Sequence, residues 1–98
     1  MNSKLDGQTV HTLYRALLSL KNEEECSALL EDLCTITEIK SMAQRLEVAQ
    51  LLRKNEIYSE IAHRTGASTA TISRVSRCLN YGTGGYTTVL SRLGDGDE

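Results

Sequence analysis

Residues 58–77 have the sequence Tyr58-Ser-Glu-Ile-Ala-His-Arg-Thr-Gly-Ala-Ser-Thr-Ala-Thr-Ile-Ser-Arg-Val-Ser-Arg77. This pattern is typical of two short helices joined by a tight turn, which must cross steeply and touch. Ala62 is small enough to lie at the crossing, where a larger side chain would push the helices apart. Gly66, four residues later, can adopt the left-handed conformation that ends the first helix. The apolar side chains predicted to seal this pair against the rest of the molecule are Ile61, Ile72 and Val75.

The two helices are predicted over about 58–65 and about 68–79, and the hydroxyl of Ser68 can cap the second one. Once the core positions are assigned, the outward positions of the second helix are all small, hydroxylic or arginine. A helix that enters the major groove of DNA needs small residues at its leading end and hydrogen-bond donors along its exposed side. The outward residues that meet this need are Ser68, Thr69, Ala70, Ser73, Arg74 and Arg77.

We therefore predict a helix-turn-helix that binds double-stranded DNA. The free amides at the start of its second helix can also hold a phosphate. A plain helical hairpin without a DNA role is the alternative, but it does not explain why the exposed face lacks Glu and Lys. The candidates for contact with base edges are Thr69, Ala70, Ser73 and Arg77. The candidates for contact with the DNA backbone are Ser59, Arg64 and Arg74.

The distribution of charge is compatible with this prediction, although the net charge is not. The chain of 98 residues has a formal net charge of −2, which by itself argues against binding to phosphates. Residues 57–81 nevertheless carry three arginines against one carboxylate, while five acidic residues gather between positions 23 and 32. Because DNA meets the local field rather than the net charge, we expect DNA binding with a modest non-specific affinity.

Helical periodicity of apolar residues covers most of the remaining sequence. Asn22 can cap one of these helices, with Glu25 as its capping-box partner. The chain has no proline to interrupt a helix, and its composition favours helices over strands. We therefore predict an all-α fold, a single helical domain over 1–93 with a frayed start at 1–7, and an acidic flexible tail at 94–98. The further helices are expected over about 8–20, 23–34, 38–53 and 86–93, with a loop at 81–85.

The sequence lacks the motifs of an enzyme, a metal site or a membrane protein. No Ser/His/Asp, Cys/His or HExxH arrangement and no nucleotide-binding glycine loop is present, so we expect no catalysis. His11 and His63 lack ligand spacing, and we expect no metal. Without an apolar run of about 18 residues or a secretory signal, we expect a cytoplasmic protein with no membrane contact. The cysteines form no CxxC motif and are interpreted as ordinary thiols; they are Cys26, Cys34 and Cys78.

Several stretches between about Leu33 and Leu79 point to a known family. They are Leu51-Leu52-Arg53, Gly66-Ala67 and Ala70-Thr71-Ile72-Ser73-Arg74, followed by Ser76 and Leu79. Over these residues, roughly half of the chain, the sequence resembles the tryptophan-repressor family. It is more similar still to a branch of uncharacterised bacterial relatives of that family. The hallmark of this branch resembles Met42-Ala-Gln-Arg-Leu, Ser59-Glu-Ile-Ala and Ser73-Arg-Val-Ser-Arg-Cys-Leu-Asn-Tyr-Gly82.

The resemblance implies about six helices and an intertwined homodimer, in which the N-terminal helices of each chain wrap through the other. The apolar residues of those helices are consistent with a dimer, because they are too many for a single chain of this size to bury. Packing within one chain only is the alternative. The apolar positions in question are Leu13, Leu17, Leu20, Leu29, Leu30 and Leu33.

The resemblance also implies an effector site, since the family holds tryptophan between two arginines beside the helix-turn-helix. Arg74 matches one of these arginines, whereas the other falls on Gln44, with Arg45 one residue away. One residue turns a side chain by about 100° around a helix, which disfavours the pairing. Val75 replaces a family glycine, and its methyl groups would crowd a flat ring. We therefore expect no cofactor or an unknown small-molecule effector instead of tryptophan, with Gln44, Arg45 and Arg74 as the candidate effector-site residues.

Taken together, these observations predict a dimeric, sequence-specific transcriptional regulator, most simply a repressor. Two recognition helices related by a two-fold axis would bind half-sites about one helical turn apart. Two alternatives remain open from the sequence. One is a DNA-binding module of the replication-initiator or sigma-factor type without a repressor role, and the other is a helical protein-interaction module.

Overall fold

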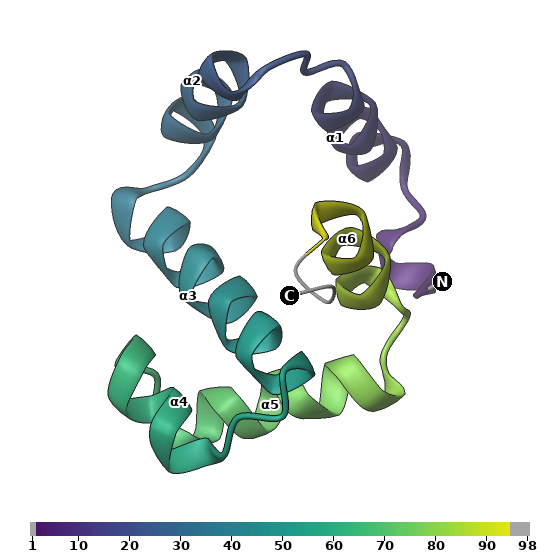
Figure 1. Cartoon of the computed structure of the whole chain (residues 1–98). Helices are drawn as coiled ribbons and strands as arrows, with labels where there is room; N and C mark the ends of the chain where they lie inside the picture. Colours follow the sequence, from purple (N-terminus) through teal and green to yellow (C-terminus); the bar gives the residue numbers. More distant parts are fainter. Residues whose placement is uncertain (1, 95–98) are drawn as a thin grey trace. The chain divides into compact units, whose positions relative to one another are not determined.

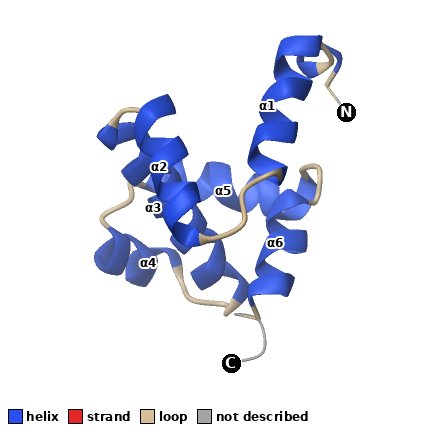
Figure 2. Ribbon diagram, turned by 90° about the horizontal axis from the view of Figure 1, so that it is seen from above, coloured by secondary structure: helices blue, strands red, loops and turns tan. Residues whose placement is uncertain are grey.

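The computed structural model of the chain describes residues 2–94, which form six α-helices and one short 3₁₀ helix. No strand occurs within this range, as Figure 2 shows, and the predicted all-α class is confirmed. The residues of the acidic tail from 95 onward lie outside the described range. The elements in chain order are η1 (Ser3–Leu5), α1 (Gln8–Leu18), α2 (Glu23–Leu33), α3 (Ile36–Arg53), α4 (Tyr58–Thr65), α5 (Thr69–Tyr81) and α6 (Gly85–Leu93) (Figure 1).

The chain divides into two compact units, Met1–Ile39 and Lys40–Glu98. The boundary falls inside α3, whose first turn belongs to the first unit and whose remainder belongs to the second. The second unit contains the predicted helix-turn-helix. The interpretation of 1–93 as one domain stays a prediction, and the two units are described separately below.

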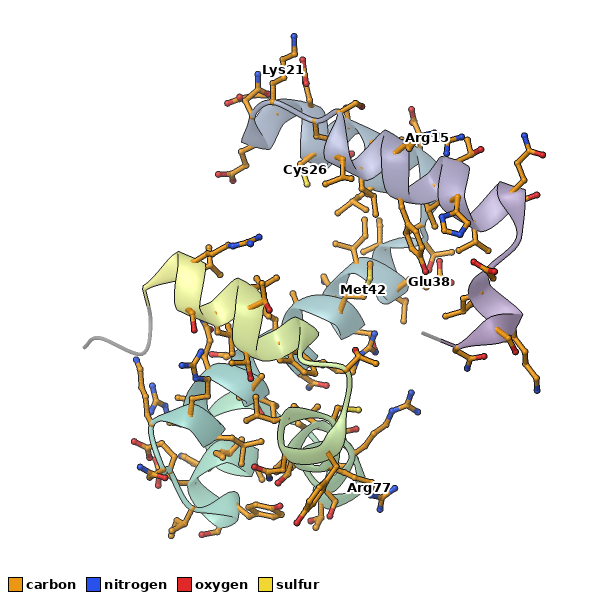
Figure 3. All side chains as sticks on the ribbon, turned by 90° about the vertical axis from the view of Figure 1, so that its right-hand side faces the viewer. Arg15, Lys21, Cys26, Glu38, Met42 and Arg77 are labelled. Carbon is orange, nitrogen blue, oxygen red and sulfur yellow. The ribbon has the colours of Figure 1, made fainter. Side chains whose placement is uncertain are left out.

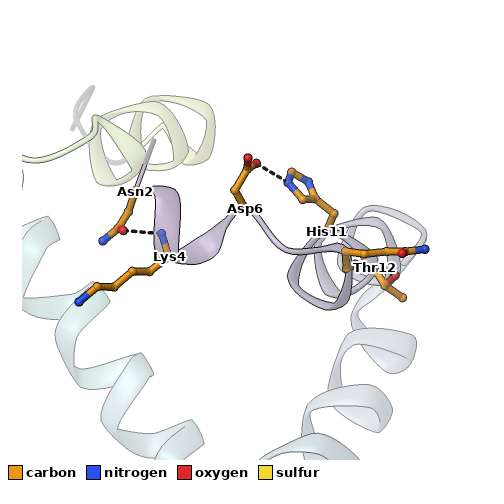
Figure 4. A network of polar contacts seen from close by, with 6 residues as sticks. Asn2, Lys4, Asp6, His11 and Thr12 are labelled. Carbon is orange, nitrogen blue, oxygen red and sulfur yellow. Dashed lines mark hydrogen bonds and ion pairs between the residues drawn. The ribbon is translucent and has the colours of Figure 1, made fainter.

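Residues 2–7 contain the short helix η1 where we predicted a frayed start at 1–7, and Met1 lies outside the described residues. The side-chain oxygen of Asn2 accepts a hydrogen bond from the amide of Lys4 at 2.9 Å and so caps η1. Asp6 lies 3.0 Å from Nε2 of His11, in the first turn of α1 (Figure 4). The bond from Asn2 satisfies a backbone amide that would otherwise be left to water, whereas the contact between Asp6 and His11 joins two side chains.

Side-chain caps set where α2 and α3 begin. Asn22 accepts from the amide of Glu25 at 2.8 Å, as predicted, but the carboxylate of Glu25 returns to the amide of Lys21 instead of that of Asn22. Thr35 and Glu38 form a complete capping box, with bonds of 3.1 and 2.7 Å. Because Thr35 is the capping residue, α3 begins at Ile36, two residues before the predicted start.

The first unit does not bury its large apolar side chains. None of the residues of α1 or α2 is buried. Leu13 and Leu17 are 39% and 40% exposed, and Leu33 and Ile36 are 56% and 72% exposed. Within the described residues, the apolar side chains of α1 and α2 therefore do not form a buried core.

The second unit has a well-defined hydrophobic core built around the end of α3. Helix α5 packs against both α4 and α6 (Figure 1). The buried positions predicted from the sequence are confirmed, since Ile61 and Ile72 are 0% exposed and Val75 is 1% exposed. Full burial of an aliphatic side chain of this size stabilises the fold by about 1.5–3 kcal/mol. The complete core consists of Val48, Ala49, Leu51, Ile61, Ala67, Ile72, Val75 and Leu90.

Helix α5 is longer than predicted. It continues to Tyr81, two residues past the expected end at Leu79. It stops at Gly82, where an added Cβ would collide with the backbone carbonyl of Cys78. The connecting loop therefore shrinks to Gly82–Gly84, and α6 begins at Gly85.

Candidate nucleic-acid interface

Helix α4 ends as the sequence predicts, at the residue where the chain must turn. Gly66 has a φ of 74°, in the left-handed region, and its amide donates to the carbonyl of Ala62 at 2.9 Å. The next residue, Ala67, is 5% exposed and belongs to the core. Helices α4 and α5 are joined by residues 66–68 alone, and the middle residue of this turn is packed in the core. We call α4, these three residues and α5 the helix-turn-helix.

Ser68 fixes the first turn of α5. Its backbone is extended, with φ −71° and ψ 159°, and its hydroxyl oxygen accepts a hydrogen bond from the amide of Thr71 at 3.1 Å. This is the predicted cap. The amides of Thr69 and Ala70 have no acceptor among residues 2–94, as is usual for the first amides of a helix. They therefore stay available to an anion at the leading end of α5.

The outward face of α5 matches the face predicted for DNA. Successive residues four apart lie on one side of a helix, and here Thr69, Ser73 and Arg77 follow that spacing, with Ala70 and Arg74 beside them. All five are exposed, whereas Ile72 and Val75 are buried on the other side. In Figure 3 the labelled side chain of Arg77 extends away from its helix.

Helix α4 supplies the other two candidates for contact with the DNA backbone. Ser59 lies in its first turn and Arg64 in its last turn, and both are exposed. The sequence-predicted residues for DNA contact are thus brought together on one helix-turn-helix, as side chains open to solvent.

No carboxylate of residues 2–94 forms an ion pair with the arginines of this surface. The ion pair between His11 and Asp6 is the only one in the part of the chain that the structure describes. Arg64, Arg74 and Arg77 therefore have no acidic partner within 4.0 Å among these residues. An arginine without an internal partner can donate to a phosphate or a base edge without first breaking a salt bridge.

The candidate effector residues of α3 are placed differently from those of α5. Gln44 and Arg45 are half-buried, while Arg74 is exposed. The side-chain amide nitrogen of Gln44 donates a hydrogen bond to the carbonyl of Thr65 at 3.1 Å. This contact between α3 and the end of α4 was not predicted from the sequence, and no local pattern could have predicted it, because 21 residues separate the two partners.

The described residues contain neither a metal site nor a membrane segment. No group of three or more His, Cys, Asp or Glu side chains is placed to hold a metal ion within residues 2–94. No helix in that range is long and apolar enough to cross a bilayer. The cysteines Cys26, Cys34 and Cys78 are free thiols in the structure.

Comparison with known proteins identifies the family. The family model described as Trp repressor protein matches residues 8–94. The chain is 56% identical over 90 residues to the uncharacterised protein YerC of Bacillus subtilis, covering 92% of this chain and 86% of the relative. Two solved structures are also similar. A TrpR-like protein from Eubacterium eligens aligns with a TM-score of 0.92 and 56% identity, over 95% of this chain and 96% of its own. A candidate Trp repressor from Staphylococcus aureus aligns with a TM-score of 0.89 and 46% identity, over 93% of this chain and 91% of its own. The chain therefore belongs to the Trp repressor family, whose members are DNA-binding transcriptional regulators.

Proposed function

We propose that the protein is a homodimeric, sequence-specific repressor that inserts α5 into the major groove of DNA. The observation that carries the proposal is the division of α5 into two faces. Ile72 and Val75 anchor it to the core, while its exposed positions between Thr69 and Arg77 carry only hydroxylic, small and arginine side chains. A helix anchored in this way can present donors to base edges without local unfolding.

Each exposed residue has a role that its chemistry allows. Arg77 can form a bidentate contact with guanine, and Thr69 and Ser73 can donate to or accept from several bases. Ala70 leaves room for close approach or contacts a thymine methyl group. Arg64 and Arg74, with the hydroxyl of Ser59, are suited to phosphates, which position the protein without selecting sequence. The amides of Thr69 and Ala70, which follow Ser68 and have no acceptor among residues 2–94, are also free to bind a phosphate.

A dimer is supported by the exposed apolar residues of the first unit. Soluble monomers rarely leave large contiguous apolar surfaces uncovered, yet Leu13, Leu17, Leu33 and Ile36 are all more than one third exposed. A second copy of the chain offers the same residues in return, as a two-fold interface requires. We propose that the paired chains place their α5 helices about one turn of DNA apart.

We propose that tryptophan is not the effector. Gln44 stands where the family has an arginine, and its amide nitrogen is already bonded to Thr65. Val75 stands where the family has glycine, and it is 1% exposed within the core. An indole ring would have to displace both a hydrogen bond and packed methyl groups, which is unfavourable.

Selection of bound duplexes from a random pool at low salt tests the proposal directly. We expect a palindromic site to be enriched by the natural protein and not by Arg77→Ala. The salt dependence of binding then counts the phosphates contacted, since each contributes a slope of about −0.9 in a log–log plot. Failure to enrich any sequence, at any salt concentration, would overturn the proposed function.

One observation favours a second candidate, a protein-interaction module. An open apolar groove of about 550 Å³ lies on the second unit, lined chiefly by Leu46 of α3, Cys78 of α5 and Tyr86 and Val89 of α6. A partner helix held in such a groove would bind through apolar contacts, so its affinity would change little with salt. The slope measured above therefore separates the two candidates.

A further inference from the structure

The hydrogen bond between Gln44 and Thr65 is unusual in this chain because it joins two helices. Among residues 2–94, only two side-chain hydrogen bonds connect different α-helices, and both lie in the second unit. The other is a long contact of 3.5 Å between the exposed side chains of Arg53 and Ser91. Gln44 makes the shorter contact, at 3.1 Å, from a half-buried position on α3.

The orientation of the Gln44 amide is determined by its partner. The oxygen of Thr65 is a backbone carbonyl, which can only accept a hydrogen bond. The side chain of Gln44 must therefore direct its NH₂ group, and not its oxygen, toward α4. A carboxylate of the same shape would place two acceptors against each other.

Thr65 forms the hydrogen bonds that hold the turn of the helix-turn-helix. It is the last residue of α4, where helix carbonyls lack a partner within their own helix. Its hydroxyl donates to the carbonyl of Ile61 at 2.7 Å and accepts from the amide of Ala67 at 3.1 Å. The hydrogen bond from Gln44 connects Thr65 to α3, which lies outside the helix-turn-helix. Thr65 is thus bonded to its own helix, to the turn and to α3.

We propose that Gln44 is a positioning residue for DNA recognition, which holds the start of α5 in place from within the chain. The turn that Gln44 anchors comes directly before Ser68 and Thr69, where α5 begins. A fixed turn reduces the conformational entropy that must be lost when α5 enters the groove. As a consequence, the protein binds its DNA site at full affinity without a small-molecule effector. The expected effect on DNA affinity rests on the proposed function, whereas the expected effect on amide hydrogen exchange in the turn does not.

The decisive variant is Gln44→Glu, which keeps the shape of the side chain and removes the donor. Gln50→Glu is the matched control, because Gln50 lies on the same helix, is also half-buried and makes no side-chain hydrogen bond to residues 2–94. A second pair consists of Gln44→Lys and Gln50→Lys. Gln44→Lys restores a donor at position 44, and Gln50→Lys adds the same positive charge elsewhere on α3. Amide hydrogen exchange at Gly66 and Ala67, the dimer content and the affinity for the selected duplex are measured for all of them.

We expect Gln44→Glu to weaken DNA binding about tenfold relative to Gln50→Glu, the usual effect of leaving a partly buried acceptor without its donor. Exchange at Gly66 and Ala67 should accelerate in this variant alone, while the dimer content stays unchanged. Gln44→Lys should recover the affinity of Gln50→Lys. Addition of L-tryptophan or of a small-molecule cell extract should leave the affinity of the natural protein unchanged.

Each of the contrary results overturns a different statement. Equal exchange and equal affinity in Gln44→Glu and Gln50→Glu would overturn the positioning role. A more than tenfold gain in affinity on addition of the extract would overturn independence from an effector. Absence of any selected duplex for the natural protein would overturn the proposed function. The exchange rates would still decide whether Gln44 holds the turn.

Discussion

The hydroxyl oxygen of Ser68 lies 3.1 Å from the backbone nitrogen of Thr71 and accepts a hydrogen bond from its N–H, which closes the first turn of α5. The same hydroxyl donates to the side-chain oxygen of Thr71, also at 3.1 Å. Ser68, the residue that caps α5, is thus both a structural cap and a member of the exposed face. Stability and DNA affinity can be separated at this position by substitution.

Replacement of Ser68 by Ala or Asp separates these two contributions. Ser68→Ala removes the cap, and we expect it to lower the free energy of unfolding by about 1 kcal/mol. Ser68→Asp keeps a capping oxygen and places a negative charge at the helix start, so its stability should be near that of the natural protein. The charge would repel phosphates, however, and DNA binding should fall more for Asp than for Ala. Urea unfolding and duplex binding measured on the same samples check this. A Ser68→Asp variant that binds DNA normally would contradict a location of Ser68 near the phosphates.

Gly66 and Gly85 make a matched pair for testing the turn. An added Cβ meets nothing within 4 Å at either position, so crowding plays no part in the comparison. Gly66 has a φ of 74°, whereas Gly85 begins α6 and has no positive φ. We expect Gly66→Ala to cost about 1–2 kcal/mol through backbone strain alone, and Gly85→Ala to be neutral or stabilising. Thermal unfolding of both variants measures the difference. Equal melting temperatures would show that the turn relaxes without cost.

Arg77 is expected to contribute to recognition without contributing to the fold. It is exposed and lacks an acidic partner among residues 2–94. Arg77→Ala should therefore weaken binding to the selected duplex by about 1–3 kcal/mol if the side chain contacts a base, with the melting temperature unchanged. Arg92→Ala, which removes an exposed arginine from α6, is the control for net charge. Titration of a labelled duplex with both variants checks the prediction. A similar loss of affinity in the two would indicate a general charge effect and no specific contact.

The exposed leucines of α1 should be needed for dimer formation. Leu17 is 40% exposed in the single chain, and we expect Leu17→Glu to shift the protein toward monomers, because burial of a carboxylate against apolar residues is unfavourable. Arg15→Glu introduces the same side chain on the same helix at an exposed polar position, and it should leave the dimer intact. Sedimentation velocity over a range of protein concentrations distinguishes monomer from dimer. Packing of α1 within one chain would instead give a natural protein that sediments as a monomer.

Much of the fold could be predicted because its signals are local. Gly66 ends α4 and Ser68 caps α5, each through its own backbone or side chain. Ile61, Ile72 and Val75 are separated by the spacing that two crossing helices impose. The boundaries that were missed depend on competing local choices. The β-branched residues Ile36 and Thr37 are weak helix formers, so the sequence favoured a later start than the capping box at Thr35 provides.

The exposure of the candidate residues on α5 could be predicted from the sequence, but the contacts that support the helix-turn-helix could not. Exposed side chains on α5 follow from the helical period once the core positions are known. The contact from Gln44 to Thr65 depends on how α3 crosses the end of α4, and that crossing is set by packing across the second unit. Ala67 was likewise not expected in the core, since a residue in a turn is usually exposed. Long-range packing, which periodicity does not encode, accounts for both.

The separation of anchoring and exposed positions along α5 has a consequence for how specificity can change. The residues that hold the helix, Ile72 and Val75, are interleaved with the outward residues but share no position with them. Substitutions at exposed positions of this kind usually alter stability by less than about 0.5 kcal/mol. A new operator preference could therefore be acquired, by natural divergence or by directed evolution, through exchange of the outward residues on an unchanged scaffold. An insertion in the three-residue turn offers no such route, because it would turn α5 as a whole and move Ile72 and Val75 out of the core.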